Sequence, residues 1–185
     1  MSETKTKNRL MDATSLHELL KVAIEDFEKA LENPNFRVQM SVWLLKPKEQ
    51  AKNNPEVCFG CLAGATLIQE IPECESFIEV DPDFDPDIYE DDPEAMQDAQ
   101  DMELNIAKLD EKYPGIKHRV LAINALRTGC VREATRLLYD QSRNLEGIEF
   151  DRITPFRYLQ GGTDNRKAFL GDLWKLWQYL VEKDL

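Results

Sequence analysis

Hydrophobic residues recur along most of this chain every three to four positions, the period of an α-helix that is buried on one face. The clearest run lies between Ser15 and Asn33. Ser15 and Glu18 form a capping-box pattern, which satisfies the first free amides of a helix, and Pro34 ends the run. The positions that this helix would bury are Leu16, Leu19, Leu20, Ala23, Ile24, Phe27 and Leu31.

The same period predicts further helices in the rest of the chain. In the C-terminal half we expect helices at 116–128, ended by Gly129, and at 131–139, together with a last helix that starts at Thr163 or Asp164. An apolar run rich in small residues predicts a closely packed helix at about 61–69, and a stripe after Pro93 predicts one at 93–109.

Residues 36–45 have a different pattern, in which apolar and polar side chains alternate. This is the period of a half-buried strand, although a short helix remains an alternative. The predicted fold class is therefore mainly α: a compact helical domain of about five helices, with at most a short β element near residues 36–45.

Length and composition favour one domain. We expect residues 1–12 to form a flexible tail and residues 13–185 a single helical domain, with an acidic insertion at about 73–92. No stretch approaches the ~20 apolar residues of a membrane span, and the first residues lack the apolar core of a secretion signal. A cytoplasmic location with reduced cysteines is expected.

The net charge of −12 is concentrated in one part of the chain. Residues 53–107 contain 16 acidic residues and no Lys or Arg, whereas the rest contains 23 basic and 19 acidic residues. Direct binding of nucleic acid is not expected from this balance, because phosphates require Lys and Arg. A partner protein with a basic surface fits it better.

Aspartates and aromatic residues alternate within the acidic insertion, as expected of a surface that docks on a basic groove. The residues that would make this contact, called the acidic interface below, are Asp81, Asp83, Phe84, Asp85, Asp87, Tyr89, Asp91 and Asp92. A solvated loop extended by self-repulsion is the alternative. A calcium-binding EF-hand loop is disfavoured, since Pro86 stands where the sharp turn needs Gly.

Cys58 and Cys61 form a C-x-x-C pair, which could bind zinc or form a redox disulfide. Zinc would need two further ligands, for which only Cys74, Cys130, His17 and His118 are available. A thioredoxin-like redox site lies between a strand and a helix in a βαβ pattern, which the sequence does not indicate. Buried structural cysteines are the simpler interpretation.

A small-anion site is a further hypothesis, with Arg119, Arg127, Arg166 and Lys167 as its phosphate contacts. Two glycines precede Arg166 and Lys167 at the expected start of the last helix, and helix N-termini bind anions. Phosphate-binding fingerprints are absent, so a plain capped loop is the alternative. No catalytic residues are predicted, since nothing near His118 forms a catalytic pattern.

Four segments carry a resemblance to a known group of proteins: Met40-Ser41-Val42-Trp43, Cys61-Leu62-Ala63-Gly64-Ala65, the stretch 121–129 with Leu126-Arg127-Thr128-Gly129, and an aromatic-rich last helix. The chain resembles, over about residues 36–180, a diverse group of small phage and bacterial proteins with M-x-x-W, C-x-A-G and L-R-x-G segments. It departs from them at Cys58, which lies three rather than five residues before Cys61, and at Ala65, where they have Trp.

That resemblance implies a mainly helical fold and a phage or mobile-element origin, without implying an activity. We therefore expect a non-enzymatic interaction protein that binds a basic partner through its acidic interface and thereby inhibits a host defence or nucleic-acid-handling protein. The alternatives are a metal or redox protein centred on Cys58 and Cys61, and a protein that binds a nucleotide or another small anion.

Overall fold

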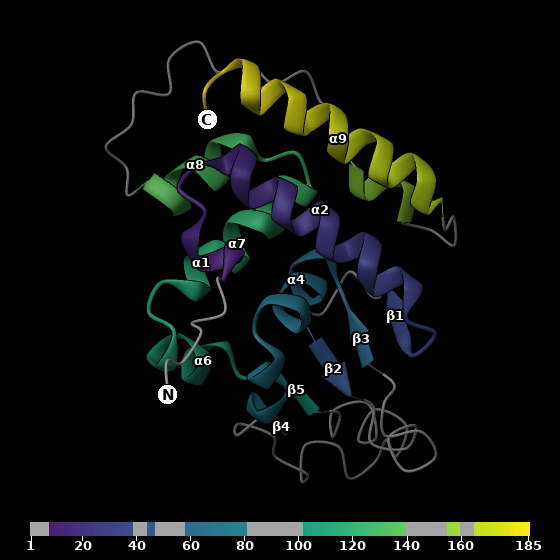
Figure 1. Cartoon of the computed structure of the whole chain (residues 1–185), viewed down its shortest axis with the longest axis vertical. Coiled ribbons are helices and arrows are strands. Elements are labelled where there is room, and N and C mark those ends of the chain that lie inside the picture. Colours follow the sequence, from purple (N-terminus) through teal and green to yellow (C-terminus); the bar gives the residue numbers. More distant parts are fainter. Residues whose placement is uncertain (1–7, 39–43, 47–57, 81–101, 140–154, 160–164) are drawn as a thin grey trace, which may run out of the picture.

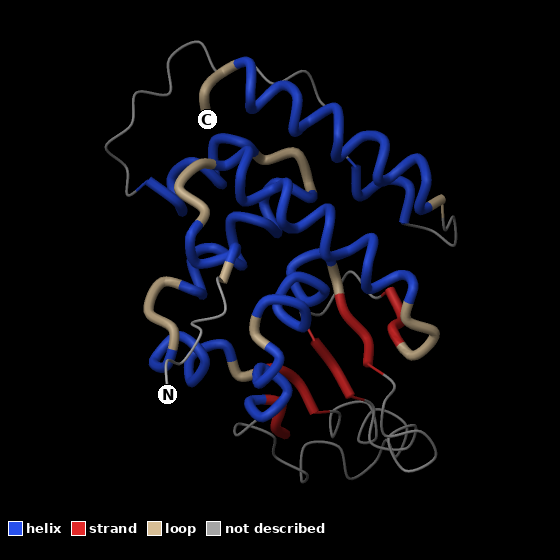
Figure 2. Tube along the Cα trace, in the orientation of Figure 1, coloured by secondary structure: helices blue, strands red, loops and turns tan. Residues whose placement is uncertain are grey.

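The computed structural model describes residues 8–38, 44–46, 58–80, 102–139, 155–159 and 165–185. These residues are mainly helical, which confirms the predicted class (Figure 1). Figure 2 shows the strands gathered at one end of the molecule, away from most of the helices. The described helices are α1 (Arg9–Asp12), α2 (Leu16–Glu32), α4 (Leu62–Glu70), α6 (Ile106–Lys112), α7 (Ile116–Arg127), α8 (Val131–Tyr139) and α9 (Arg166–Glu182), with 3-10 helices η1 (Pro72–Phe77) and η3 (Pro155–Leu159).

The central element is α2, which packs against α1, α4, α7, α8, α9 and β1. Its start confirms the predicted cap, because Ser15 Oγ accepts a hydrogen bond from the Glu18 amide at 3.2 Å. The Glu18 carboxylate in turn accepts from the Thr14 amide at 2.7 Å. Because α2 is enclosed on several sides, even polar positions of its sequence are drawn into the interior.

Phe27 joins three elements of the core. Its ring meets Phe169 of α9 edge to face, with centroids 5.6 Å apart, and meets Phe36 of β1 in the same manner at 6.4 Å. Such edge-to-face pairs add to the energy of burial itself. Figure 1 shows the consequence, with α9 lying along one side of α2 and β1 starting beside the far end of α2.

The α7–α8 hairpin forms as predicted. Gly129 has a φ of 79°, the left-handed conformation that glycine adopts most readily. The turn is closed by a hydrogen bond from the Cys130 amide to the Ala125 carbonyl at 2.9 Å. The last helix starts slightly later than predicted, because Asn165 is its cap and accepts from the Ala168 amide at 3.0 Å.

A five-stranded sheet closes the other end of the fold, in the order β1-β3-β2-β5-β4. Only β1 and β3 run parallel, and the other neighbours are antiparallel. The strands are β1 (Phe36–Val38), β2 (Leu44–Lys46), β3 (Cys58–Gly60), β4 (Ile78–Val80) and β5 (Met102–Leu104). The predicted β element near residues 36–45 thus corresponds to β1 and the start of β2, and the sheet contains three strands that the sequence pattern did not predict.

Three expectations about local structure need correction. Residues 102–104, placed in a helix at 93–109, form β5, because they pair with β2 and β4. The acidic insertion expected at about 73–92 is part of the fold at its start, since residues 72–77 form η1 and residues 78–80 form β4. The tail 1–12 is not flexible throughout: residues 9–12 form α1, in which Leu10 is fully buried.

Arg9 holds α1 in place through three carboxylates. Its side chain forms ion pairs with Asp26, with Glu25 at 2.7 Å and with Glu70 at 2.7 Å. Its main-chain amide also donates to Glu70 Oε2 at 2.7 Å. One arginine therefore connects α1 to both α2 and the end of α4, although α1 itself is only one turn long.

Asp26 is the most deeply buried member of this cluster, with no exposed surface. Oδ1 contacts Arg9 and lies 3.6 Å from Lys29 Nζ, but Oδ2 has no hydrogen-bond partner. Burial raises the pKa of Asp26 from 3.8 to about 6, against the opposing attraction of Arg9. The cluster therefore favours a protonated Asp26 more strongly than the unfolded chain does.

Replacing Asp26 by Asn should change how stability depends on pH. In the wild type, the unfolded chain loses the Asp26 proton at a lower pH than the folded protein does. The free energy of unfolding should therefore fall as the pH rises from about 4 to about 6. Over this rise in pH, the free energy of unfolding of the wild type should fall by up to about 3 kcal/mol relative to that of Asp26→Asn. Urea denaturation followed by circular dichroism at pH 4 and pH 7 measures the difference.

Glu32→Gln is the matched control, because it removes a carboxylate from the exposed last residue of α2. The change in its free energy of unfolding between pH 4 and pH 7 should equal that of the wild type. If Asp26→Asn also gives a parallel profile, the unfavourable burial of the Asp26 charge is refuted.

Candidate functional site

The eight residues of the acidic interface lie outside the described residues, but the strands on either side of them are described. Val80 at the end of β4 is paired with Met102 at the start of β5. The two described residues that flank residues 81–101 are therefore neighbours at one end of the sheet. Residues 81–101 contain ten acidic residues and no Lys or Arg.

A second connection starts at the same end of the sheet. Lys46, the last residue of β2, is also paired with Met102. Since β3 runs antiparallel to β2, its first residue, Cys58, lies at this end too. Residues 47–57 and residues 81–101 are thus attached to one end of the sheet, and the acidic charge is attached at a single place on the fold.

Cys58 and Cys61 lie at the junction between a strand and a helix, which the sequence pattern did not predict. Cys58 is the first residue of β3, and Cys61 is the cap residue of α4. Both are buried, with exposed fractions of 5% and 1%. The adjoining helix α4 is buried along most of its length and has small residues next to the cap.

The electrostatics at Cys61 favour the thiol over the thiolate. Burial raises the pKa of Cys61, although the amides of Gly64 and Ala63 and the charge of Arg127 act in the opposite direction. Metal ligation and thiol exchange both use the thiolate. The described part of the chain has no group of three or more His, Cys, Asp and Glu side chains that could hold a metal ion. The zinc hypothesis remains a prediction.

The four residues predicted to bind a small anion do not come together. Arg119 and Arg127 are eight residues apart on α7, which is about 12 Å along a helix axis. Arg127 is buried, with 7% of its surface exposed. Burial lowers the pKa of Arg127, against the opposing effect of Cys61. Arg166 and Lys167 begin α9, whose first turn lies well away from α7 in Figure 1.

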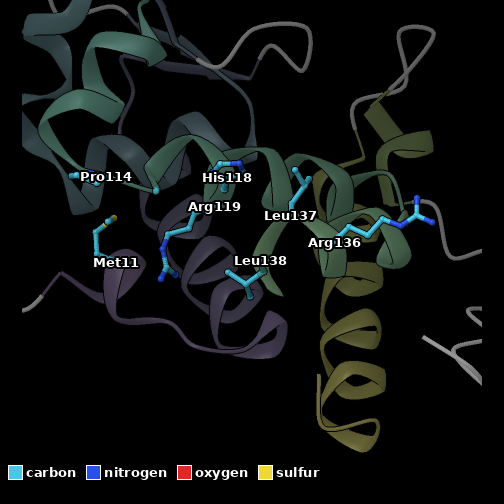
Figure 3. A pocket seen from close by; sticks show the side chains of 8 residues that line it. Met11, Pro114, His118, Arg119, Arg136, Leu137 and Leu138 are labelled. Carbon is cyan, nitrogen blue, oxygen red and sulfur yellow. The ribbon is translucent and has the colours of Figure 1, made fainter. Parts of the chain in front are cut away.

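Arg119 instead lines a groove of about 600 Å³ between α1, α7 and α8. The other basic residues of its lining are His118 and Arg136, the lining contains no acidic residue, and Met11, Leu137 and Leu138 supply apolar surface. Figure 3 shows Arg119 pointing toward Met11 and Leu138, whereas Arg136 extends away from them. Met11, Arg136 and the two leucines were missed as site residues because no local motif connects them.

Arg119 also has a structural role in this groove. Its Nη1 donates hydrogen bonds to the main-chain carbonyls of Leu10, at 3.0 Å, and Ala13, at 2.5 Å. Carbonyls at the end of a helix lack partners within that helix, so Arg119 satisfies the end of α1. The sequence pattern identified Arg119 as a phosphate contact but not this contact with α1.

Comparison of the chain with protein-family models, with curated proteins and with solved structures gives no match. Among the helices that the structure describes, none is long and apolar enough to cross a membrane.

The four thiols should differ sharply in reactivity. Cys58, Cys61 and Cys74 are buried and Cys130 is exposed, so a colourless disulfide reagent that releases a coloured thiol should modify Cys130 first. The buried thiols require local opening, which should slow them by ~100-fold or more. Titration in native buffer and again in denaturant, with peptide mapping by mass spectrometry, measures this.

Cys130→Ser is the control, and it should remove the fast phase completely. Modification of Cys58 or Cys61 at the rate of Cys130 would contradict their burial and would restore the case for a redox site.

Proposed function

We propose that this chain is a non-enzymatic interaction protein that binds a basic surface of a partner protein through the acidic interface. The observation that carries the proposal is the separation of charge. Seven of the twelve residues from 81 to 92 are acidic, while the chain outside residues 53–107 has a small positive balance. A charge distributed for solubility alone would not need this concentration.

The attachment of residues 81–101 supports the proposal. Because Val80 and Met102 are paired, all ten acidic residues between them belong to a single excursion from one end of the sheet. Carboxylates brought to one place produce a stronger local field than the same charges spread over the surface. Such a field accelerates the encounter with a basic partner and disfavours acidic ones.

The aromatic residues of the acidic interface add a second property. Phe84 and Tyr89 lie between aspartates in the sequence, and large aromatic side chains commonly supply much of the energy of a protein interface. Charge alone gives fast but salt-sensitive association, whereas burial of these rings would add affinity that resists salt. The combination favours a specific partner over general attraction to cations.

The partner class that fits best is a protein whose basic groove normally binds phosphates. Regularly spaced carboxylates can occupy such a groove in place of the phosphates of a nucleic acid. Inhibition of a host defence or nucleic-acid-handling protein follows from this competition, and the resemblance to phage and bacterial proteins favours the same class.

The test compares two variants that lose equal charge. Asp81, Asp83, Asp85 and Asp87 are changed to Asn in the first, and the exposed Glu28, Glu32, Glu111 and Glu182 are changed to Gln in the control. Proteins captured from a bacterial lysate by the wild type are purified, and their affinities for all three chains are measured by calorimetry. The first variant should weaken binding by at least about tenfold, and the control by less than about twofold.

Circular dichroism should show that both variants keep the helical content of the wild type, since neither changes a buried residue of the described core. Equal losses in the two variants would show that only net charge matters. Unchanged binding in the first variant would refute the acidic interface.

A further inference from the structure

The groove between α1, α7 and α8 has a charge opposite to that of the whole chain. Three of its lining residues, His118, Arg119 and Arg136, have basic side chains, and none of the lining residues is acidic. In a protein with twelve more negative than positive charges, a recess lined in this way would attract anions from solution.

Arg119 is the strongest electrostatic feature of this groove. Its side chain is partly buried and forms no ion pair with any described residue, because its known partners are the carbonyls of Leu10 and Ala13. Carbonyl groups satisfy two hydrogen-bond donors but carry no net charge, so among the described residues the positive charge of the guanidinium is opposed by the attraction of Asp12 alone, without an ion pair. Burial lowers the pKa of Arg119, and only Asp12 opposes this effect.

Arg9 provides the comparison within the same fold. It is also a partly exposed arginine beside α1, with one third of its side chain exposed, but three carboxylates neutralise it. At Arg9 the fold thus supplies acidic partners for the guanidinium. At Arg119 it leaves donors and charge beside an open recess.

The remaining wall of the groove is apolar. Met11, Leu137 and Leu138 are all partly exposed, and they line the recess together with the basic residues. A ligand that matches both parts would have an anionic group for Arg119 and an apolar or aromatic portion for this wall. The volume of about 600 Å³ lies within the range of small-molecule pockets.

We infer that this groove binds a small phosphorylated molecule with an aromatic portion, of about the size of a mononucleotide. The guanidinium of Arg119 contacts the phosphate, because a planar guanidinium pairs well with phosphate oxygens. His118 lies next to Arg119 in the chain and lines the same recess, but Figure 3 shows its side chain pointing away from the Arg119 guanidinium, so Arg119 makes this contact without it. Arg136 is more than half exposed and 3.9 Å from Glu133, so it adds mainly long-range attraction.

This site is independent of the acidic interface, because it consists of residues 11 and 114–138 only. It differs from the predicted small-anion site in its members, since Arg119 is the only residue that the two share. It also differs in its ligand, which has to offer apolar surface as well as negative charge.

Binding is tested by calorimetry with four compounds: adenosine monophosphate, phenyl phosphate, inorganic phosphate and adenosine. Either aromatic phosphate should bind at least about tenfold more tightly than inorganic phosphate or adenosine alone. Tighter binding of adenosine monophosphate would indicate a nucleotide, and tighter binding of phenyl phosphate a smaller aryl phosphate. Absence of binding by both aromatic phosphates would overturn the inference.

Variants then locate the site. Arg119→Gln should weaken the aromatic phosphate by at least about tenfold, the effect expected from losing one charge-assisted hydrogen bond. His118→Gln should weaken it by a smaller factor. Arg132→Gln is the matched control, since Arg132 is exposed on α8 and does not line the groove. Equal effects of Arg119→Gln and Arg132→Gln would show that only net charge attracts the ligand, and would overturn the site.

Because Arg119 also holds the end of α1, its variant could fail to fold. Amide chemical shifts of the wild-type protein give a measurement that does not depend on that variant. Addition of adenosine monophosphate or phenyl phosphate should shift the resonances of residues 115–119 and 136–138. Shifts confined to the start of α9, at Arg166 and Lys167, would place the anion elsewhere and refute the groove.

Discussion

The position of Arg9 among the carboxylates of Glu25, Asp26 and Glu70 is the constraint on which the N-terminal half of the structure depends. Asp26 lies on the central helix at a fully buried position, where an unpaired carboxylate would be strongly destabilising. Arg9 reaches it from α1 and is itself held by Glu70 at the end of α4. A helix of one turn, too short to be stable alone, is thereby fixed against α2 and α4.

The position of α1 determines the groove as well. Once Arg9 fixes α1, the carbonyls of Leu10 and Ala13 face α7, where Arg119 donates to both. Met11, between them, becomes part of the groove lining. The cationic recess is therefore a consequence of how α1 is held. Arg9 positions the helix and is paired with carboxylates, whereas Arg119 has no such pairing with a described residue and donates to the carbonyls at the end of the helix.

Local signals in the sequence predicted the longer helices well. The bounds of α2, α7 and α8 follow from Ser15, from the turn at Gly129 and from the helical period between them. These features act within a few residues, so sequence spacing is enough to reveal them.

The sheet could not be found in this way, since three-residue strands are too short to show a period of two. β5 depends on pairing with Lys46 and Val80, far away in the chain.

In the candidate site too, some residues could be identified from the local sequence and others only from the tertiary structure. Arg119 was identified from its charge, but its neighbours Met11 and Leu138 come from segments more than 100 residues apart in sequence. The contact of Arg9 with Glu70 spans 61 residues. Contacts of this kind depend on tertiary packing and leave no local pattern. The burial of Cys61 is an intermediate case, because the small residues of α4 indicated close packing but not the strand before it.

Two surfaces of opposite charge on one small fold would weaken each other if they were close. They are separated by the body of the protein: α4 packs against α7 on one side and against β3 on the other, so it lies between the groove and the sheet. The strands that flank residues 81–101, β4 and β5, belong to this sheet and pair with each other. The two proposed surfaces thus start from different layers of the fold, so substitutions in one leave the contacts that build the other unchanged.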